Sequence, residues 1–247
     1  MQPKITLLSS ELNDRILGEA LELMLQPGIK VQSKEALELL AAHGAQVDVQ
    51  NQVAYIPDKL VHQALSTTPR QFTLYDRFGN PKVNYSGDMV HFDPGSSGVH
   101  VLDPETFEHY PSQTADLVRL VKVAEMLPQY AAQSTAVVCN EVPKAIGDLF
   151  RMYVVLLHSN KPVVTGAFAV DTLQYMIDML AIFSGGRQEL KKAPRAVFDV
   201  CPSPPLIWSE FGAQNLIELA RAGIPAQIVS MPLAGAAGPV TLLGSVV

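Results

Sequence analysis

The sequence has 247 residues, of which 48% are hydrophobic and 17% are charged, a composition typical of a globular protein. Its formal net charge of -6 and its pI of about 5.5 argue against a nucleic-acid-binding surface. No apolar run reaches the roughly 18 residues of a membrane span, and the first residues lack the pattern of a signal peptide. Two cysteines, Cys139 and Cys201, lie far apart, which fits free thiols in a reducing cytoplasm.

The first 87 residues predict a small α+β lobe. Ser9 or Ser10 can cap a first helix that Pro27-Gly28 ends. Ser33 starts a second amphipathic helix, which closes at Gly44. The other elements expected here are a hairpin of residues 45–49 and 53–56, a short helix over 57–66, and strands at 71–75 and 81–85.

Residues 88–247 repeat the order strand, loop and helix. Short apolar runs bounded by turn residues, with helix-length patterns between them, indicate parallel strands in βα units. Consecutive apolar positions fit strands that are buried on both faces. The expected strands begin at Met89, Tyr130, Pro162, Ala196 and Ala226, and residues 103–106 predict the turn of a hairpin. The expected helix starts are Thr114, Asn140–Pro143, Asp171 with Gln174, Ser209, and Gly238-Pro239.

Five such strands leave two architectures open. One is a complete, open, doubly wound sheet, and the other is a TIM (β/α)8-type barrel that is truncated after about five strands, since a closed barrel needs eight. The apolar stretch Leu242–Val247 carries no helix stop signal, which favours the truncated barrel. The sequence therefore predicts an α/β protein with an N-terminal α+β lobe at residues 1–87 and a partial βα barrel at residues 88–247.

Reactive groups in βα folds lie at the carboxyl ends of the strands, which selects five loops. Structural roles compete with functional ones there. Asp171 and Ser209 read first as helix caps, Asp93-Pro94-Gly95 as a turn, and Cys201 as a small buried residue. The loops carry Phe92, Asp93, Ser96, Ser97, Gln133, Ser134, Asn140, Glu141, Phe168, Asp171, Asp199, Cys201, Ser203, Trp208, Ser230 and Met231.

The sequence gives little support for a metal-binding or nucleotide-binding site. His91, His100 and His109 are evenly spaced, but the spacing matches no compact zinc motif, so no metal is expected. Neither a dinucleotide-binding nor a P-loop glycine motif occurs. The glycine-rich loop Ala234–Pro239 could hold an anion through backbone N–H groups, or could serve as a tight turn.

The residues themselves resemble the trimethylamine methyltransferase (MttB-like) family, in register over essentially the whole chain. The segments that carry this resemblance include Leu8–Glu11, Gly28–Val31, Ser33–Leu40, Gly44–Asp48, Val53–Pro57, Leu74–Arg77, Asn160–Pro162, Cys201–Pro205 and Ala234–Gly244. The resemblance implies a TIM-barrel methyltransferase that moves a methyl group from a tertiary or quaternary amine, such as trimethylamine or glycine betaine, to the Co(I) centre of a cognate corrinoid protein. It implies no directly bound cofactor, since the partner carries the corrinoid (cobalamin), and we expect a cytoplasmic homo-oligomer.

Family members are about twice as long as this sequence, and the position of their pyrrolysine belongs to the other half. The subgroup, and with it the identity of the amine, therefore stays open.

The implied substrate directs attention to aromatic and acidic residues. A quaternary ammonium cannot donate a hydrogen bond, so a site holds it with aromatic faces and nearby carboxylates. The strand-end residues of these types are the predicted substrate-binding residues Phe92, Glu141, Phe168, Asp199 and Trp208. Core packing and helix capping are the competing roles. A quaternary amine leaves as a neutral amine, so no catalytic acid, base or nucleophile is assigned.

Two other functions stay open at this stage. One is a non-catalytic half-barrel that acts as a binding or assembly module, since an exposed strand edge invites pairing. The other is a different βα-barrel enzyme, such as a lyase or aldolase. That option lacks an obvious Schiff-base lysine, because Lys161, Lys191 and Lys192 precede strands and lie away from the active face.

Overall fold

The computed structural model of the protein describes residues 6–168 and 171–247, and the chain divides into two compact units. Two elements, α8 (Glu210–Ala222) and β12 (Ala226–Ile228), contribute residues to both. The boundary expected at residues 87 and 88 stays a prediction. Unit 1 contains Met1–Thr68, Cys201–Gln214 and Ile228–Val247, and unit 2 contains Pro69–Val200 and Asn215–Gln227.

Unit 1 is built on a mixed sheet with the strand order β11-β1-β3-β2. Strand β1 pairs antiparallel with β3 and parallel with β11. Val31, Leu37 and Ala54 form its buried core. The predicted helices and hairpin of residues 9–67 are thereby confirmed. Its elements are α1 (Ser10–Leu25), β1 (Ile29–Val31), α2 (Lys34–Ala42), β2 (Gln46–Asp48), β3 (Val53–Tyr55), α3 (Asp58–Thr67), β11 (Ile207–Trp208) and α9 (Leu242–Val246).

The last helix, α9, starts later than predicted. Its N-cap is Thr241, whose hydroxyl accepts a hydrogen bond from the Gly244 N–H at 3.1 Å. The expected start at Gly238-Pro239 is wrong because the preceding loop closes on itself. The Gly235 N–H donates to the Pro239 carbonyl, and the Gly238 N–H donates to the Leu233 carbonyl, both at 2.9 Å.

Unit 2 is built on a parallel sheet with the strand order β8-β9-β10-β12. Strands β8, β9 and β10 run parallel, and the expected α/β class is confirmed. Within the described residues the sheet is open, with β8 and β12 at its edges, and no helix is both long and apolar enough to cross a membrane. The elements of unit 2 are β4 (Gln71–Tyr75), β5 (Pro81–Ser86), β6 (His100–Leu102), β7 (His109–Pro111), α4 (Thr114–Met126), β8 (Gln133–Ser134), the 3₁₀ turn η1 (Lys144–Ile146), α5 (Gly147–His158), β9 (Val163–Thr165), α6 (Thr172–Ser184), α7 (Arg187–Lys192) and β10 (Ala196–Val200).

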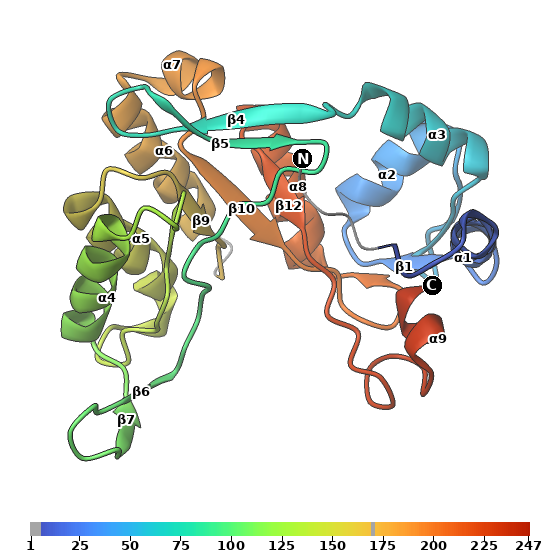
Figure 1. The fold of residues 1–247 in the computed structure, drawn as a ribbon. Coiled ribbons are helices and arrows are strands. Elements are labelled where there is room, and N and C mark those ends of the chain that lie inside the picture. The colour runs from blue at the N-terminus through green and yellow to red at the C-terminus, as the bar shows by residue number, and fades with distance from the viewer. Residues whose placement is uncertain (1–5, 169–170) are drawn as a thin grey trace. The chain divides into compact units, whose positions relative to one another are not determined.

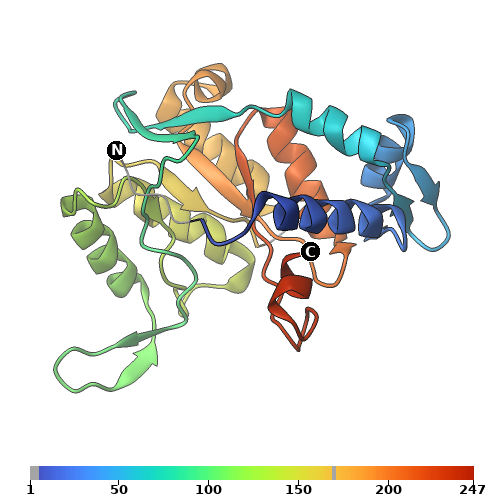
Figure 2. The ribbon, with the colours of Figure 1, turned by 45° about the vertical axis from the view of Figure 1, so that its right-hand side comes forward.

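One face of this parallel sheet is covered by helices. Figure 1 shows α4, α5 and α6 on one side of β9 and β10, and successive helices contact each other along this layer. Figure 2 shows α4 and α5 beside each other from a second direction. The Gln133 side chain points to this layer, since its amide donates to the Val121 carbonyl of α4 at 2.9 Å. Side chains alternate along a strand, so Ala132 and Ser134 point to the opposite face.

The opposite face, called the inner face below, packs against the β4–β5 hairpin. Leu74 and Val83 of the hairpin form one buried cluster with Ala132, Val164 and Val197 of the sheet. Two backbone hydrogen bonds fix the hairpin at the amino ends of β9 and β10. They run from Tyr75 to the Pro194 carbonyl at 2.9 Å and from Arg77 to the Asn160 carbonyl at 2.8 Å. The hairpin therefore covers the inner face at the amino-terminal end of the strands.

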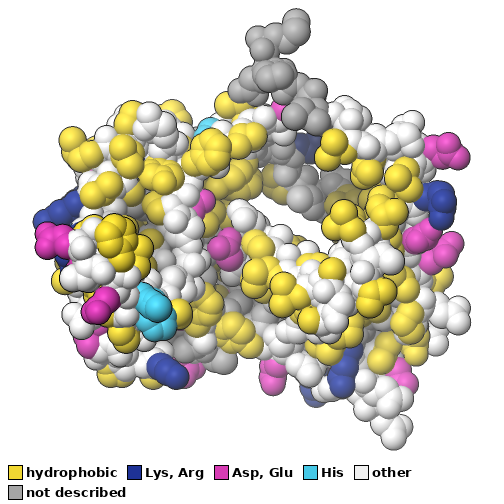
Figure 3. All heavy atoms as spheres, turned by 60° about the horizontal axis from the view of Figure 1, so that its bottom comes forward, with side chains coloured by type: hydrophobic (Ala, Val, Ile, Leu, Met, Phe, Trp, Pro, Cys, Tyr) yellow, Lys and Arg dark blue, Asp and Glu magenta, His cyan; other side chains and the backbone are white. Residues whose placement is uncertain are grey.

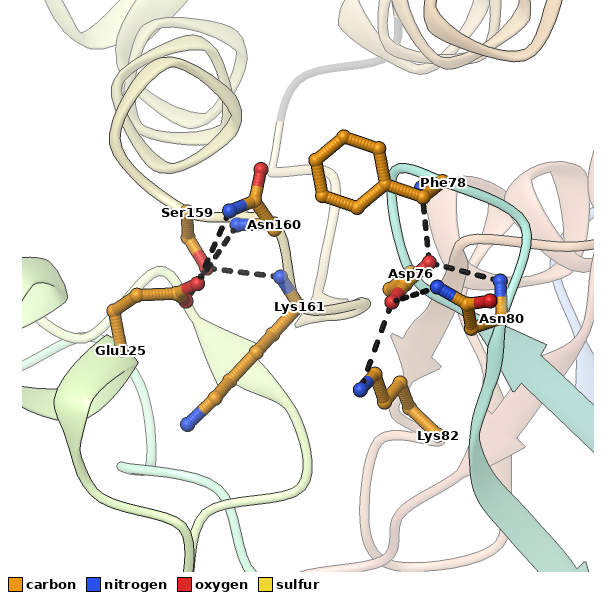
Figure 4. A network of polar contacts seen from close by, with 8 residues as sticks. All are labelled: Asp76, Phe78, Asn80, Lys82, Glu125, Ser159, Asn160 and Lys161. Atoms are coloured by element: carbon orange, nitrogen blue, oxygen red, sulfur yellow. Dashed lines mark hydrogen bonds and ion pairs between the residues drawn. The ribbon is translucent and has the colours of Figure 1, made fainter.

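Two polar clusters order the turns that carry these backbone bonds (Figure 4). Asp76 accepts hydrogen bonds from the backbone and side-chain N–H groups of Asn80 at 2.9 and 3.1 Å, and pairs with Lys82 at 3.6 Å. Glu125 accepts hydrogen bonds from the Ser159 hydroxyl at 2.5 Å and from the Asn160 N–H at 3.3 Å. Asp76 is buried, so its several donors offset the cost of removing the carboxylate from water.

The strand expected from Met89 is wrong. Only isolated parallel bridges, Phe92 to Tyr130 and Gly98 to Val137, join this segment to the chain around β8. The turn at Asp93 interrupts regular pairing, because Pro94 has no N–H and Gly95 has a φ of +75°. Strand β8, expected from Tyr130, is limited to Gln133–Ser134, the two residues that pair with Val163 and Val164 of β9.

One predicted helix start and two predicted N-caps also differ from the structure. Thr114 is the first residue of α4, while Gln113 is its N-cap, with its N–H held by Asp116 at 2.9 Å. Residues 140–143 precede the 3₁₀ turn η1, so α5 starts only at Gly147. Asp171 occupies the N-cap position of α6 but makes no side-chain capping bond there.

Phe198 is fully buried on the helix-facing side of the parallel sheet, so we expect its truncation to lower stability strongly. Phe198→Ala should lower the free energy of unfolding by about 3–5 kcal/mol, because it removes apolar contacts and leaves a cavity. Phe78→Ala is the matched control, since Phe78 is 72% exposed. Urea denaturation measures both. A Phe198→Ala loss no greater than that of the control would contradict this packing.

Candidate functional site

Asp199 lies on the inner face, at the carboxyl end of β10. Val197 of the same strand contacts the β4–β5 hairpin, and Asp199 follows two residues later, so both point to one face. Gly166 follows β9 beside it: a Cβ atom at this glycine would lie 3.3 Å from the Asp199 carbonyl oxygen. A larger residue here would press on the backbone of Asp199 and, at 3.6 Å, on the ring of Phe168.

The surroundings of the Asp199 carboxyl group disfavour its charged form. Its Oδ1 atom is buried, and it has no hydrogen-bond partner among the described residues. Burial, and then the negative charge of Asp93, raise the pKa of this carboxyl from 3.8 to about 6. A carboxylate without donors or a counter-ion loses free energy on burial, so a cation bound here would be stabilised.

Tyr85 supplies an aromatic group close to these acids. Its ring lies 4.8 Å, centroid to centroid, from that of Phe72 and 6.1 Å from that of His91, edge-on to the latter. Burial, and then the charges of Asp93 and Asp199, raise the pKa of the Tyr85 phenol. The Tyr85 phenol therefore lies within the electrostatic influence of both carboxyl groups.

The loop of residues 93–98 places Asp93. Its Oδ1 atom accepts the Gly95 N–H at 2.9 Å, which confirms the predicted turn. The Ser134 hydroxyl donates to the Gly95 carbonyl, and the Gly98 N–H donates to the Ala136 carbonyl at 2.9 Å. The loop is therefore fixed to the carboxyl end of β8, and the turn aspartate also contributes charge to the site.

Phe168, which follows β9, is the aromatic residue at the next strand end. Its ring is 62% exposed, and the Arg151 guanidinium carbon lies 5.2 Å from the ring centroid. Its backbone N–H donates to the Asp148 carboxylate at 2.5 Å. A cation over one face of an aromatic ring is attracted by its electrons, so Arg151 fixes how the ring is presented.

Glu141 and Phe92 have different surroundings. The Glu141 Oε1 atom accepts the Thr114 N–H at 2.7 Å, so this residue completes the start of α4. The side-chain and backbone hydrogen bonds from Thr114 lower the Glu141 pKa. Phe92 is 63% exposed, and its backbone pairs with Tyr130. Their substrate-binding roles stay predictions.

Trp208 belongs to unit 1. It lies in β11 opposite Val31 and packs against the core of that unit. Ser209 follows it and accepts the Gly212 N–H at 3.1 Å, which confirms the predicted cap. Cys201, expected to be buried, is exposed instead, because it lies beyond the end of β10. A substrate-binding role for Trp208 is untested.

The three evenly spaced histidines lie in two places. His100 and His109 face each other across the β6–β7 hairpin, with ring centroids 6.2 Å apart. His91 instead hydrogen-bonds to the Asn84 carbonyl at 3.0 Å. Within residues 6–168 and 171–247, no three histidine, cysteine or acidic residues are grouped to hold a metal ion.

Exposed apolar side chains are common on this protein. Figure 3 shows many hydrophobic side chains at the surface of one face, with acidic and basic ones dispersed among them. In the segment between β5 and β6, Met89, Val90 and Val99 are exposed in the same way as Phe92, and so is Phe168 after β9.

The sequence interpretation missed Tyr85 and Arg151. Tyr85 was assigned only to a strand, and the packing of its hairpin on the inner face has no local signal. The sequence does contain a pattern that indicates Arg151. Asp148 and Arg151 are three residues apart, and Val155 follows four residues later. That spacing places a charge pair on the buried face of a helix, where charges need a specific purpose.

Comparison with known proteins gives a consistent result. The family model described as trimethylamine methyltransferase (MTTB) matches residues 1–247. A trimethylamine methyltransferase MttB of Desulfitobacterium hafniense is 30% identical over 229 residues, which is 92% of this chain and 46% of that protein. The MttB of Methanosarcina thermophila is 26% identical over 251 residues, which is 99% of this chain and 52% of that protein.

A glycine betaine methyltransferase of Desulfitobacterium hafniense is 23% identical over 245 residues. That alignment covers 98% of this chain and 50% of the relative. The chain therefore spans about half the length of the curated relatives it matches.

The raised Asp199 pKa predicts how stability depends on pH. Below about pH 4 the carboxyl is protonated in both the folded and the unfolded chain. Between about pH 4 and pH 6 the folded state binds more protons, so the free energy of unfolding falls as pH rises through this range. Asp199→Asn should remove this fall, and melting temperatures from pH 3 to pH 8 measure it.

Asp178→Asn is the control for this measurement, since Asp178 forms an exposed pair with Arg187 at 2.5 Å. The control should keep the wild-type pH dependence. An Asp199→Asn profile that is parallel to the wild-type profile would show that Asp199 titrates normally.

Proposed function

Because the chain belongs to the trimethylamine methyltransferase family, we propose that it takes part in removing a methyl group from a methylated amine. The names of its relatives support trimethylamine and glycine betaine as the substrate class. The acceptor that we propose is the Co(I) centre of a separate corrinoid protein, which supplies a strong nucleophile. The expected cytoplasmic location and homo-oligomeric state stay predictions.

The observation that carries this proposal is the partly buried Asp199 carboxyl near the carboxyl end of β10, whose Oδ1 atom has no hydrogen-bond partner among the described residues. A methylated ammonium is a bulky cation with an apolar surface, and it needs negative charge together with an aromatic face. Asp199 has a buried oxygen without a partner, and Asp93 adds a second negative charge. The exposed ring of Phe168 at the neighbouring strand end offers further aromatic surface.

The proposed methyl transfer does not depend on a proton-donating residue. The bond between nitrogen and the departing methyl carbon breaks, nitrogen keeps the electron pair, and the methyl group passes to the acceptor. A quaternary ammonium leaves as a neutral amine, so no general acid is needed. The role of Asp199, Asp93 and the aromatic rings is to bind and orient the cation, because in-line displacement requires close alignment of the reacting atoms.

Within the same proposal, unit 2 forms part of a βα barrel. The order β8-β9-β10-β12 follows the chain without reversal, whereas a doubly wound sheet reverses its order at a switch point. Helices α4, α5 and α6 also contact one another in sequence, as the outer ring of a barrel does. The turn of the β4–β5 hairpin, residues 76–80, would then lie at the amino-terminal end of the barrel, while Tyr85, near the other end of β5, lies towards the site.

An assay of the protein expressed from its complete reading frame tests this function. With reduced cobalamin and its corrinoid partner, it should demethylate at least one compound in a panel of trimethylamine, dimethylamine, glycine betaine and choline. Mass spectrometry of deuterated methyl groups follows the transfer. Binding of an amine without turnover of any compound in the panel would instead favour the alternative of a non-catalytic binding module.

Tetramethylammonium binding provides a direct test of the site residues. Asp199→Asn should weaken binding about tenfold at pH 8, which corresponds to about 1.4 kcal/mol, because the variant lacks the negative charge. Wild-type binding should weaken as the pH falls below about 6, since protonation neutralises Asp199. Calorimetry measures both effects, with Asp178→Asn as the control, and equal affinities would place the cation elsewhere.

A further inference from the structure

Arg151 is a buried charged residue to which the proposed reaction gives no direct role. It lies in the middle of α5, and only 4% of its surface is exposed. Its Nη1 atom donates to the Thr135 carbonyl at 3.1 Å and to the Ser97 hydroxyl at 3.4 Å. The guanidinium carbon also lies over the Phe168 ring, 5.2 Å from its centroid. One side chain thus contacts the segment after β8, the loop of residues 93–98, and the segment after β9.

Asp148 complements Arg151 from one turn earlier in the same helix. It is buried, and its carboxylate accepts the Phe168 N–H at 2.5 Å and the Thr172 hydroxyl at 2.6 Å. Burial lowers the pKa of the Arg151 guanidinium, and the negative charge of Asp148 acts in the opposite direction. Asp148 therefore partly offsets the positive charge of Arg151 and, through its own hydrogen bonds, holds the segment after β9.

The backbone of the neighbouring loop supports a constraining role. Ser97 has a φ of +63°, a left-handed conformation that a residue other than glycine adopts when its surroundings hold it. Its N–H donates to the Thr135 carbonyl at 3.3 Å, and its hydroxyl accepts from Arg151. Both contacts hold the loop that carries Asp93.

We propose that Arg151 is a positioning residue, which holds Phe168 and the loop of residues 93–98 so that an aromatic face and the Asp93 carboxylate are preset for a methylated ammonium. This inference rests on the proposed function. Two buried opposite charges do not by themselves stabilise a fold. The contacts that Arg151 makes with both loops are therefore the better explanation for its presence in α5. A planar guanidinium can stack on a ring and donate to two acceptors at once, which the ammonium of lysine cannot do.

The substitution Arg151→Lys tests this role, since it keeps the charge and loses the planar geometry. It should weaken tetramethylammonium binding at pH 8 three- to tenfold. It should also shift the fluorine NMR signal of Phe168 in protein labelled with 4-fluorophenylalanine, a signal that Phe168→Leu identifies. Arg119→Lys is a matched control, because Arg119 pairs with Asp116 at 2.6 Å, also three residues apart, on the neighbouring helix α4.

Ser97→Ala is a second variant that leaves the buried charge in place. It removes one acceptor of Arg151 and should weaken tetramethylammonium binding about twofold to threefold with little change in melting temperature. If Arg151→Lys does not fold, the tetramethylammonium affinity of Ser97→Ala alone tests the positioning role. Wild-type affinity in Ser97→Ala, or in a folded Arg151→Lys protein whose Phe168 signal is unchanged, would overturn the positioning role.

The outcomes separate the two proposals. A wild-type protein that binds no methylated ammonium would contradict the proposed function and the positioning role together. A wild-type protein that binds tetramethylammonium, with variants that bind it equally well, would contradict only the positioning role.

Discussion

The register between β9 and β10 is the constraint on which the site depends. Val164 pairs with Val197, and both contact the β4–β5 hairpin on the inner face. Two residues further along β10, Asp199 points to that same face. A slip of one residue would turn Asp199 towards the helices and would move Phe198 out of its buried position. The apolar packing at the amino end of the strands therefore fixes the direction of an acidic side chain at the carboxyl end.

The two ends of the inner face have opposite properties. At the amino end, apolar side chains and satisfied polar groups such as Asp76 fill the space, and these contacts favour the folded state. At the carboxyl end, Asp199 retains an unpartnered oxygen among the described residues, and its charge is disfavoured by burial and by Asp93. Proteins accept such local costs where a ligand supplies the missing interaction. Asp148 and Arg151 show a different solution, since these two buried charges lie near each other and order the loops around them.

Much of the fold was predictable because its signals are local. Apolar runs marked β9 and β10, and Ser9, Ser33 and Ser209 marked helix starts that the structure confirms. The rule that reactive groups follow parallel strands selected Asp199 and Phe168. The strand expected at Met89 was wrong, since turn geometry at Asp93 outweighed the apolar pattern. Tyr85 could not be assigned to the site from the sequence, because the hairpin reaches the sheet only through tertiary packing. Glu141 was chosen for its charge, but its carboxylate caps α4, a contact that spans 27 residues of sequence.

In the proposed site Asp199 is the acid that meets the ammonium, and the titration of its carboxyl group tests this role most directly. A carbon-13 NMR titration of the Asp199 carboxyl, assigned with Asp199→Asn, should give a pKa of about 6 in the free protein. Saturating tetramethylammonium should lower this pKa, because a bound cation stabilises the carboxylate and binding is linked to proton release. A pKa near 3.8 in the free protein, or a raised pKa that does not respond to tetramethylammonium, would contradict the central claim.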